Sequence, residues 1–336
     1  NLKNIVNYVK SNYRWNGVYG KYVFNQMNEF LKTKSGNDAN LNLFLIGLLQ
    51  ASGFDAVPIV LSTRENGTIN KEYPFDDFFN YVIARVNLND SIFYIDATEP
   101  MLYFDQLPER CLNIEGLTVK PKTDEWVKIE EKGLSTIYKD FKINLLPAQN
   151  ILNADIKVEA NSVNAYNFRK ILSDKNEKLE SYLKKQYGFE ILTLDVENAK
   201  KYENPFEFRF LTILSLENKQ TIEIHPFCKM SLSDNPFKQL SRTLPVDLIY
   251  RKAYKYKSVI QIPDNYKVTA LPIPIDTKNQ YYSLFYSAVQ NENTIVIEAA
   301  FEFSKNIYQA KDYGYMRSCV NTAINKFAEL VVLEKN

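Results

Sequence analysis

The chain has 336 residues with 41 basic and 40 acidic side chains, and its net charge of +1 provides no overall field that attracts nucleic acid or anionic lipid. Hydrophobic residues make up 45% of the chain, including 23 tyrosines and 21 phenylalanines, so it can bury large cores, and its length is typical of two or three domains. No apolar run reaches the ~20 residues of a membrane-spanning helix. We therefore expect a globular, β-rich protein that neither binds nucleic acid nor crosses a membrane.

The first residues predict an amphipathic helix, because Leu2, Ile5, Val6 and Val9 recur at helical spacing. The start of the chain lacks the charged-then-apolar pattern of a signal peptide. We therefore expect the chain to be cut from a longer precursor, whose missing part could have held an export signal.

A nearly all-round hydrophobic helix is predicted from about Asp38 to Ser52, and such a helix is normally buried inside a domain. Asn37 or Asp38 can cap the free amide groups at its start, and Gly53 is placed to end it in a left-handed turn. Its apolar residues are Leu41, Leu43, Phe44, Leu45, Ile46, Leu48 and Leu49.

Three strands are predicted after this helix. The first is the apolar run from Val57 to Leu61, which leads to a tight turn at Asn66-Gly67. Two further strands, at 79–86 and 91–96, are joined by a short polar turn at 87–90 and form an antiparallel hairpin. The hairpin ends in Asp96-Ala97-Thr98.

This order of elements resembles the transglutaminase-like fold, a relative of papain-type cysteine proteases, in which a nucleophilic cysteine opens the buried helix. The resemblance implies an α+β fold class, with a transglutaminase-like (papain-like) N-terminal domain followed by β-rich, sandwich-like C-terminal domains. Segments that resemble a bacterial cell-envelope branch of the family, with flanking β-rich domains of unknown function, are 8–9, 14–17, 61–67, 79–83, 94–100, 242–248, 262–266 and 331–335.

The resemblance places the family's Cys-His-Asp triad on Asp38, on Tyr81 with Asn80 as the neighbouring possibility, and on Asp96. Only the third position keeps its residue type. A cysteine at a helix N-terminus has a lowered pKa and is activated further by a histidine. Asp38 is expected to be an anion that the same helix field stabilises, and a carboxylate cannot cleave or transfer an amide through a thioester.

Three domains are expected along the chain, at 1–130, 131–236 and 237–336. The second contains predicted strands at 142–146, 151–159, 190–196 and 208–216 and an amphipathic helix at 167–187. The third is predicted as a small antiparallel sandwich with strands at 256–262, 281–289 and 294–303, a helix at 311–326 and a closing strand at 330–333.

The three cysteines, Cys111, Cys228 and Cys319, are scattered and odd in number, so they predict free thiols without a disulfide framework or a metal site. His225 is the only histidine, and the nearby Cys228 suggests a catalytic pair. On a strand, however, an offset of three residues places two side chains on opposite faces. We therefore interpret His225 as structural.

Asp38 and Asp96 would lie close together if the fold is kept, and two carboxyl groups can share a proton, hold a cation or act as acid and base. The simpler interpretation makes Asp38 a helix cap and Asp96 the cap of a turn, since no histidine is available for Asp96 to orient. We favour the caps and expect no metal ion and no cofactor.

Four residues are candidates for ligand binding beside the presumed cleft: Trp15, Tyr19, Asn37 and Arg64. The two aromatic rings, which belong to a cluster with Tyr13 and Tyr22, could stack on a sugar or a peptide. Arg64 could pair with a ligand carboxylate. Core packing for the rings and simple solvation for Arg64 are the alternatives that we favour.

The preferred hypothesis is a catalytically inactive transglutaminase-like protein that serves as a binding or scaffold module in the bacterial cell envelope. Its partner would be a peptide, a glycan or an envelope protein. The alternative is an enzyme of altered chemistry, a hydrolase or transferase that uses Asp38 and Asp96 with Tyr81. A third possibility is that the core is only a spacer. A periplasmic or cell-envelope location follows from the resemblance alone.

Overall fold

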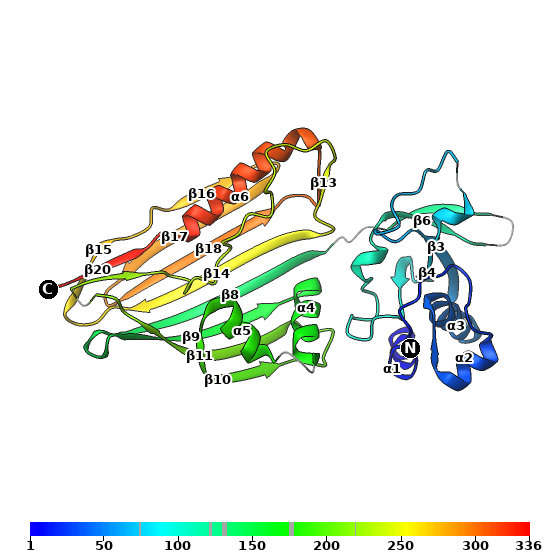
Figure 1. Ribbon diagram of the computed structural model, residues 1–336, viewed down its shortest axis with the longest axis horizontal. Helices are drawn as coiled ribbons and strands as arrows, with labels where there is room; N and C mark the ends of the chain where they lie inside the picture. Colours follow the sequence, from blue (N-terminus) through cyan, green and yellow to red (C-terminus); the bar gives the residue numbers. More distant parts are fainter. Residues whose placement is uncertain (74, 121–122, 130–132, 175–177, 219) are drawn as a thin grey trace. The chain divides into compact units, whose positions relative to one another are not determined.

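The computed structural model describes residues 1–73, 75–120, 123–129, 133–174, 178–218 and 220–336. The chain folds into two compact units, Asn1–Lys132 and Gly133–Asn336 (Figure 1). The boundary expected from the sequence at residue 130 falls at 130–132, which lie outside the described residues.

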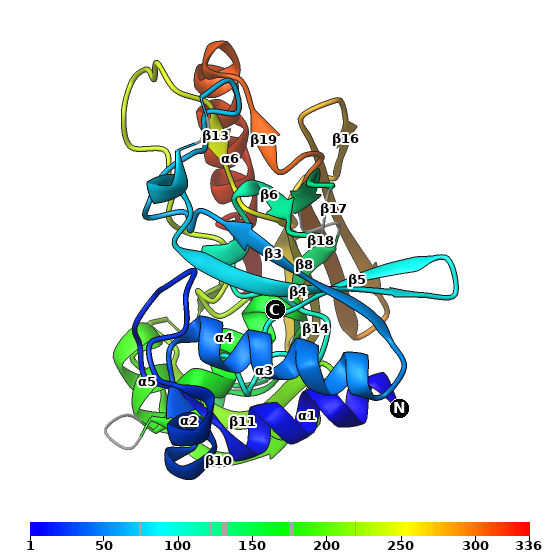
Figure 2. The ribbon, with the colours of Figure 1, turned by 90° about the vertical axis from the view of Figure 1, so that its right-hand side faces the viewer.

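The first unit is built on an antiparallel sheet with the strand order β5-β4-β3-β6-β7. Helices α1 and α3 lie side by side against it (Figure 2). Its helices are α1 (Leu2–Asn12), α2 (Met27–Thr33) and α3 (Asp38–Ala51), with short helical turns η1 (Asp76–Phe78) and η2 (Glu109–Cys111). Its strands are β1 (Arg14–Trp15), β2 (Ser35–Gly36), β3 (Asp55–Leu61), β4 (Tyr81–Leu88), β5 (Ser91–Ile95), β6 (Ile114–Thr118) and β7 (Glu125–Ile129).

The predicted buried helix is α3, and its two ends explain its bounds. The side chain of Asn37 caps its start by accepting a hydrogen bond from the backbone amide of Asn40 at 3.0 Å. Gly53 follows its end with φ +86°, a conformation that glycine adopts without strain. Asn37 is therefore the cap, and the expectation that Asp38 caps the helix was wrong.

Two asparagines inside α3 connect the helix to the segments that form the candidate site. Asn42 donates to the carbonyl of Val82 on β4 and accepts from the amide of Ala97, both at 2.8 Å. Asn40 accepts from the amides of Phe24 and Asn25, both at 3.2 Å. These buried amides are satisfied by backbone groups that lie outside α3. The helix start, β4 and the turn after β5 are thereby held in one place.

The second unit is built on one eight-stranded sheet with the order β10-β11-β9-β8-β14-β18-β17-β16, antiparallel except for the parallel pair β8 and β14. The sheet strands are β8 (Leu134–Leu146), β9 (Ile151–Ala160), β10 (Glu190–Glu197), β11 (Phe206–Ser215), β14 (Arg251–Gln261), β16 (Ile275–Lys278), β17 (Tyr282–Asn291) and β18 (Thr294–Phe303). The helices are α4 (Ser162–Ser173), α5 (Leu179–Tyr187) and α6 (Tyr313–Phe327). Smaller pieces are β12 (Thr221–Ile224), β13 (Val246–Asp247), β15 (Tyr266–Ala270), β19 (Ile307–Tyr308) and β20 (Val331–Lys335), with turns η3 (Pro147–Gln149) and η4 (Ala310–Asp312).

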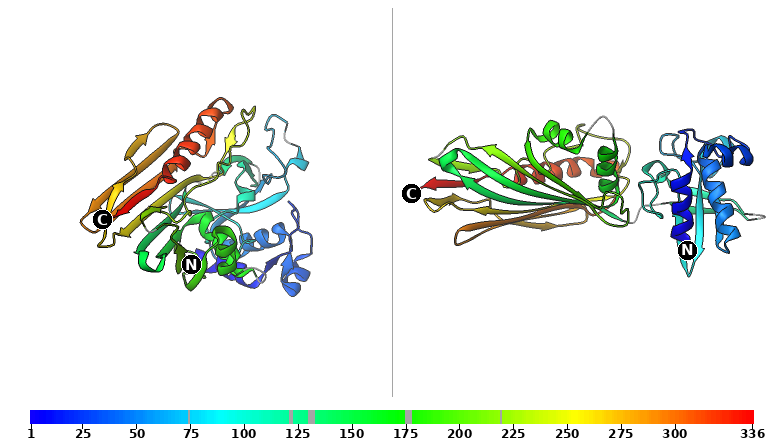
Figure 3. Two further views of the ribbon diagram at one scale, coloured as in Figure 1. Left: turned by 60° about the vertical axis from the view of Figure 1, so that its left-hand side comes forward. Right: turned by 90° about the horizontal axis from the view of Figure 1, so that it is seen from below.

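One face of the large sheet is covered and the other is open. Every second residue along β11 is buried, as in Phe206, Phe208 and Phe210, and contributes to one core with α4, α5 and α6. The right-hand view of Figure 3 shows these three helices on the same side of the sheet. On the other side, charged residues pair across strands, as do Lys157 and Glu207 at 2.7 Å. The alternation matches an antiparallel sheet with one solvated face.

The structure differs from the expected second and third domains in three ways. The position 236/237 is no break, because β8 and β14 on either side of it pair over their length. Helices and the small sheet β12-β20-β15 contribute to the core on the covered face, where a sandwich of two large sheets was expected. The helix predicted at 167–187 is two helices, and residues 175–177 between them lie outside the described residues. Alternating burial shows which face is covered, but it does not show what covers it.

The shared sheet predicts how fragments of the chain will behave. A fragment of residues 133–336 is expected to unfold in one cooperative transition. A fragment of residues 237–336 is expected not to fold, because β14 loses its partner β8 and the apolar residues of β14 and β18 lose part of their cover. Urea unfolding followed by circular dichroism distinguishes the two fragments. Cooperative unfolding of the shorter one would restore the domain boundary expected at 236/237.

Candidate functional site

The first residue of α3 is Asp38, whose side chain is fully buried. Its Oδ1 accepts a hydrogen bond from the amide of Gly20 at 2.7 Å, and its Oδ2 accepts one from the amide of Val82 at 2.9 Å. The turn before the helix is tight, since a Cβ on Gly36 would lie 2.6 Å from the Cβ of Asn40. Asp38 therefore joins the loop before α3 to strand β4.

Burial raises the pKa of Asp38 to about 8, because the desolvation of the charged form outweighs the hydrogen bonds from Val82 and Gly20. The charge of Asp96 raises the pKa of Asp38 further. Asp38 is then largely protonated at neutral pH. The sequence-based expectation of a stabilised anion was wrong. The cost of removing the charged carboxylate from water is larger than the stabilisation that the helix dipole and the hydrogen bonds give it.

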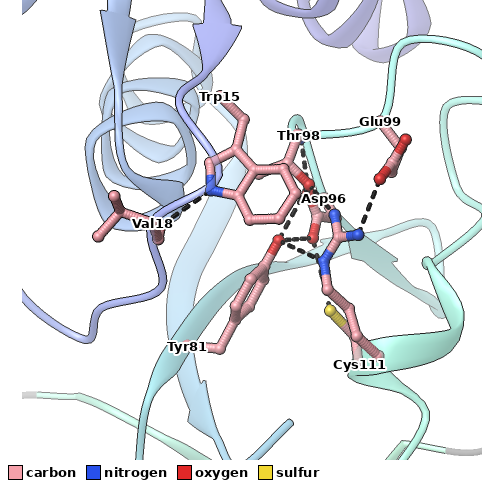
Figure 4. A network of polar contacts seen from close by, with 8 residues as sticks. Trp15, Val18, Tyr81, Asp96, Thr98, Glu99 and Cys111 are labelled. Carbon is pink, nitrogen blue, oxygen red and sulfur yellow. Dashed lines mark hydrogen bonds and ion pairs between the residues drawn. The ribbon is translucent and has the colours of Figure 1, made fainter. Parts of the chain in front are cut away.

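Asp96 collects side-chain donors from three elements. Its Oδ2 accepts from the hydroxyl of Tyr81 on β4 at 2.7 Å, and its Oδ1 accepts from the amide of Thr98 at 2.6 Å and from the hydroxyl of Thr98 at 2.5 Å (Figure 4). The thiol of Cys111 on η2 lies 3.5 Å from Oδ2. All four side chains are buried. Tyr81 and Asp96, which the resemblance singled out, are therefore in contact, and the other partners of Asp96 are Thr98 and Cys111.

Arg110 covers this network. Its Nε donates to the hydroxyl of Tyr81 at 3.3 Å, its Nη2 donates to the hydroxyl of Thr98 at 2.5 Å, and its Nη1 pairs with Glu99 at 2.7 Å. The guanidinium also lies 4.4 Å from the centre of the Trp15 ring, which is a cation–π contact. A cation that stacks on one ring and donates to three side chains holds the region closed.

The hydroxyl groups of the network, on Tyr81 and Thr98, are both engaged in hydrogen bonds within the protein. The hydroxyls of Tyr81 and Thr98 lie within hydrogen-bonding distance of Asp96 and, at 2.9 Å, of each other, and each accepts from Arg110 through a lone pair. Burial raises the pKa of Tyr81 well above its usual range, as does the neighbouring Asp96. The tyrosine is thus held as a neutral donor and does not supply a base.

Cys111 is the one thiol of the first unit, and it is in contact with Asp96. Its side chain is about 1% exposed, and burial together with the charge of Asp96 raises its pKa well above the usual range. A nucleophilic cysteine needs the opposite surroundings, with a lowered pKa and access to solvent. The contact between Cys111 and Asp96 therefore makes the thiol a buried donor. Cys111, Cys228 and Cys319 are all free, as predicted.

Three further sequence candidates make contacts within the protein. Asn80 accepts from the amide of Thr63 at 2.8 Å and donates to its hydroxyl at 2.9 Å, so it fastens the loop after β3. Asn37 donates to the carbonyl of Tyr22 at 2.7 Å in addition to capping α3. Arg64 donates to the carbonyl of Leu112 at 2.8 Å. All three stabilise loops around the network.

The aromatic candidates do not form a single cluster. Tyr13 packs in the core against Phe30, with ring centres 5.0 Å apart. Trp15 and Tyr19 stack at 5.4 Å beside the network, where Tyr19 also meets the ring of Tyr81 edge-on. Tyr22 is 69% exposed. Tyr19 and Trp15 therefore connect the buried network to the surface.

The sequence predicted Asp96 as the cap of a turn at Asp96-Ala97-Thr98, and the bond from the amide of Thr98 to Asp96 confirms it. It did not predict the contact of the Thr98 hydroxyl with Asp96 or the part played by Arg110. Arg110 carries no local signal, because it reaches the network from η2 only through the folding of the segment after β5.

Within the described part of the chain, no three or more His, Cys, Asp and Glu residues lie close enough to hold a metal ion. The same residues contain no helix that is both long and apolar enough to span a bilayer.

Residues 219–333 match the model of the family described as "Domain of Unknown Function with solved-structure structure (DUF3858)". The structure is similar to the crystal structure of a protein named a "putative protease" from Parabacteroides distasonis, with a TM-score of 0.55 and 10% sequence identity. The match covers 99% of this chain and 51% of that one, so the chain spans about half the length of the solved protein. At this identity the similarity shows the fold alone. No curated protein matches the sequence.

Asp38 predicts a pH dependence of stability. The unfolded chain ionises this group near pH 4 and the folded chain ionises it only near pH 8, so the folded state binds more protons in between. Its contribution is therefore full in acid and is lost as the pH rises through 8. The stability of the wild type relative to Asp38→Asn should fall by about 2–5 kcal/mol between pH 4 and 8.5.

Urea unfolding at several pH values measures this difference. Asp90→Asn, at an exposed position of the same unit, is the matched control, and its difference from the wild type should stay nearly constant. If the Asp38→Asn difference is equally flat, Asp38 is ionised throughout the range and the assignment above is wrong.

Removing the guanidinium tests whether Arg110 is structural. Arg110→Met should lower the free energy of unfolding by about 2–4 kcal/mol, because Glu99 loses its cation and the hydroxyls of Tyr81 and Thr98 lose donors in a buried place. Arg14→Met, at an exposed position of the same unit, should change it by about 0.5 kcal/mol or less. Equal effects of the two substitutions would show that the network does not depend on Arg110.

Proposed function

We propose that the first unit is a transglutaminase-like domain that has lost its catalytic groups and acts as a binding or scaffold module of the cell envelope. The observation that carries the proposal is the position of Asp38. This residue begins the buried helix where the resembling family has its nucleophile, and its carboxyl oxygens are both held by backbone amides.

The other two positions support the same conclusion. Tyr81 stands where the resembling family has its histidine, and it donates to Asp96 as a neutral hydroxyl. Asp96 has the same residue type as the third triad position of the resembling family, but its carboxyl oxygens accept hydrogen bonds from Tyr81, Thr98 and Cys111. The one histidine of the chain, His225, belongs to the second unit. A thiol mechanism therefore has neither an accessible nucleophile nor a base in this unit.

An exposed group of aromatic side chains supports a binding role. We call Tyr19, Tyr22, Phe24 and Phe75 the aromatic rim; their exposed fractions are 37%, 69%, 73% and 65%. The Lys21 ammonium pairs with Asp76 at 2.5 Å, so the loop that carries the first three rings lies beside η1. Exposed rings grouped on one surface are typical of a recognition site. The rim fits an extended peptide or a glycan, both of which stack on aromatic faces.

The alternative of altered chemistry depends on the raised pKa of Asp38. A protonated carboxyl group at neutral pH is a possible general acid, and such shifts gather at active sites. Asp38, Tyr81 and Asp96 are each fully buried, however, and Arg110 lies over the last two. This chemistry would require the Arg110 cover to open.

Two assays separate the binding module from the enzyme. The purified chain should neither hydrolyse peptides nor incorporate amines into glutamine substrates, and Asp38→Asn should leave that null result unchanged. On peptidoglycan-fragment and extended-peptide arrays, the wild type should bind members of one class. The double variant Tyr22→Ser/Phe24→Ser should lose at least about tenfold in affinity, by the removal of two stacking rings.

Tyr8→Ser, at an exposed aromatic residue on α1 that does not belong to the aromatic rim, is the matched control and should bind as the wild type does. Thiol-blocked activity that disappears in Cys111→Ser would overturn the inactive assignment. If Tyr22→Ser/Phe24→Ser binds as tightly as the wild type, the aromatic rim is not the recognition surface.

A further inference from the structure

The second unit contains a cavity of about 550 Å³ that lies apart from the network around Asp96. Its walls come from β9, the segment that joins α5 to β10, the end of β11, β12 and the turn after β12. A volume of this size is in the range of pockets that hold small molecules. Side chains from elements far apart in the sequence form it, so the cavity is a product of the folded unit.

Part of the cavity lining is apolar and aromatic. The rings of Tyr187 and Phe189 stack with their centres 5.5 Å apart at 21°, and both residues line the cavity. Leu152 and Ile222 add buried aliphatic surface. Paired aromatic faces favour a flat ring as their occupant, because stacking adds to the burial of apolar area.

His225 and Cys228 line this same cavity. The sequence-based argument placed them on opposite faces of a strand, and it was wrong because β12 ends at Ile224 and the chain then turns. The amide of Cys228 donates to the carbonyl of His225 at 3.0 Å, which closes the turn. Cys228 has φ +48°, a left-handed conformation that costs a residue with a side chain about 1 kcal/mol.

Neither group carries a charge at neutral pH. Burial lowers the pKa of His225, and burial raises the pKa of the Cys228 thiol to about 12. A neutral imidazole and a neutral thiol do not form a catalytic pair. The Nδ1 atom of His225 is buried and has no hydrogen-bond partner in the described residues, so it is not exposed to an occupant of the cavity.

Three charged residues belong to the cavity lining. Glu217, Glu223 and Lys229 line it and are all exposed, so their charges remain in water. A charged ligand body would lose its hydration inside without gaining a buried partner of opposite sign. The charge distribution therefore favours a neutral occupant.

We propose that this cavity binds an uncharged aromatic small molecule. It would lie against the aromatic part of the lining, Tyr187 and Phe189. The site belongs to the whole second unit, because its aromatic wall precedes residue 219, where the family match begins. This inference is independent of the function proposed for the first unit.

The test uses the full chain and N-phenyl-1-naphthylamine, a neutral aromatic amine whose fluorescence rises in apolar surroundings. The wild type should bind it at one site with micromolar affinity. Leu214→Trp fills the cavity and should weaken binding at least tenfold. Leu211→Trp is the matched control, because it lies on the same strand but does not line the cavity. Equal binding by the wild type and Leu214→Trp would overturn the proposal.

A second measurement needs no variant, in case Leu214→Trp fails to fold. Saturating probe should slow the alkylation of Cys228 by iodoacetamide at least fivefold, as followed by mass spectrometry. Cys319, on α6 and outside the cavity lining, is the internal control and should react at an unchanged rate. Unchanged alkylation of Cys228 at saturating probe would show that the probe binds elsewhere and would contradict the assignment.

Discussion

The first unit depends on the carboxylate of Asp96. It accepts hydrogen bonds from the hydroxyls of Tyr81 and Thr98, the amide of Thr98 and the thiol of Cys111, and all of these side chains are buried. A buried carboxylate that lost these donors would cost several kcal/mol, so each partner must stay where it is. This requirement favours the observed positions of the turn after β5, which carries Thr98, and of η2, which carries Arg110 and Cys111.

The same contacts determine the chemical state of the neighbouring side chains. The helix start holds Asp38 between two amides, and Tyr81 is a neutral donor to Asp96. Arg110 lies over Tyr81 and Thr98. The polar groups of the network therefore bond to one another within the protein.

Local patterns in the sequence predicted helices α1 and α3, strand β3 and the hairpin of β4 and β5, because each carries its own signal, but they did not predict α2, β6 or β7. The hydrophobic run with Asn37 and Gly53 at its ends predicted α3 almost to the residue. The site was predicted only in part. The positions of Asp38, Tyr81 and Asp96 came from the resemblance, whereas the contacts of Arg110 and Cys111 depend on a segment whose path has no local signal.

In the second unit, strands were predicted well and their arrangement was not. Alternation along β11 indicates a buried face, but the parallel pairing of β8 with β14 joins residues more than one hundred positions apart. The same limit applies to His225 and Cys228. Their spacing was interpreted on a strand, and the turn that follows Ile224 brought them to one cavity.

The central claim is that the buried network around Asp96 is closed and structural. The most direct measurement is the alkylation rate of Cys111 in the native chain as a function of pH and of low concentrations of urea. The account predicts a rate far below that of the unfolded chain, which rises with urea as the network opens. Rapid alkylation without urea, with a midpoint below pH 8, would show an accessible thiolate beside Asp96 and would contradict the account.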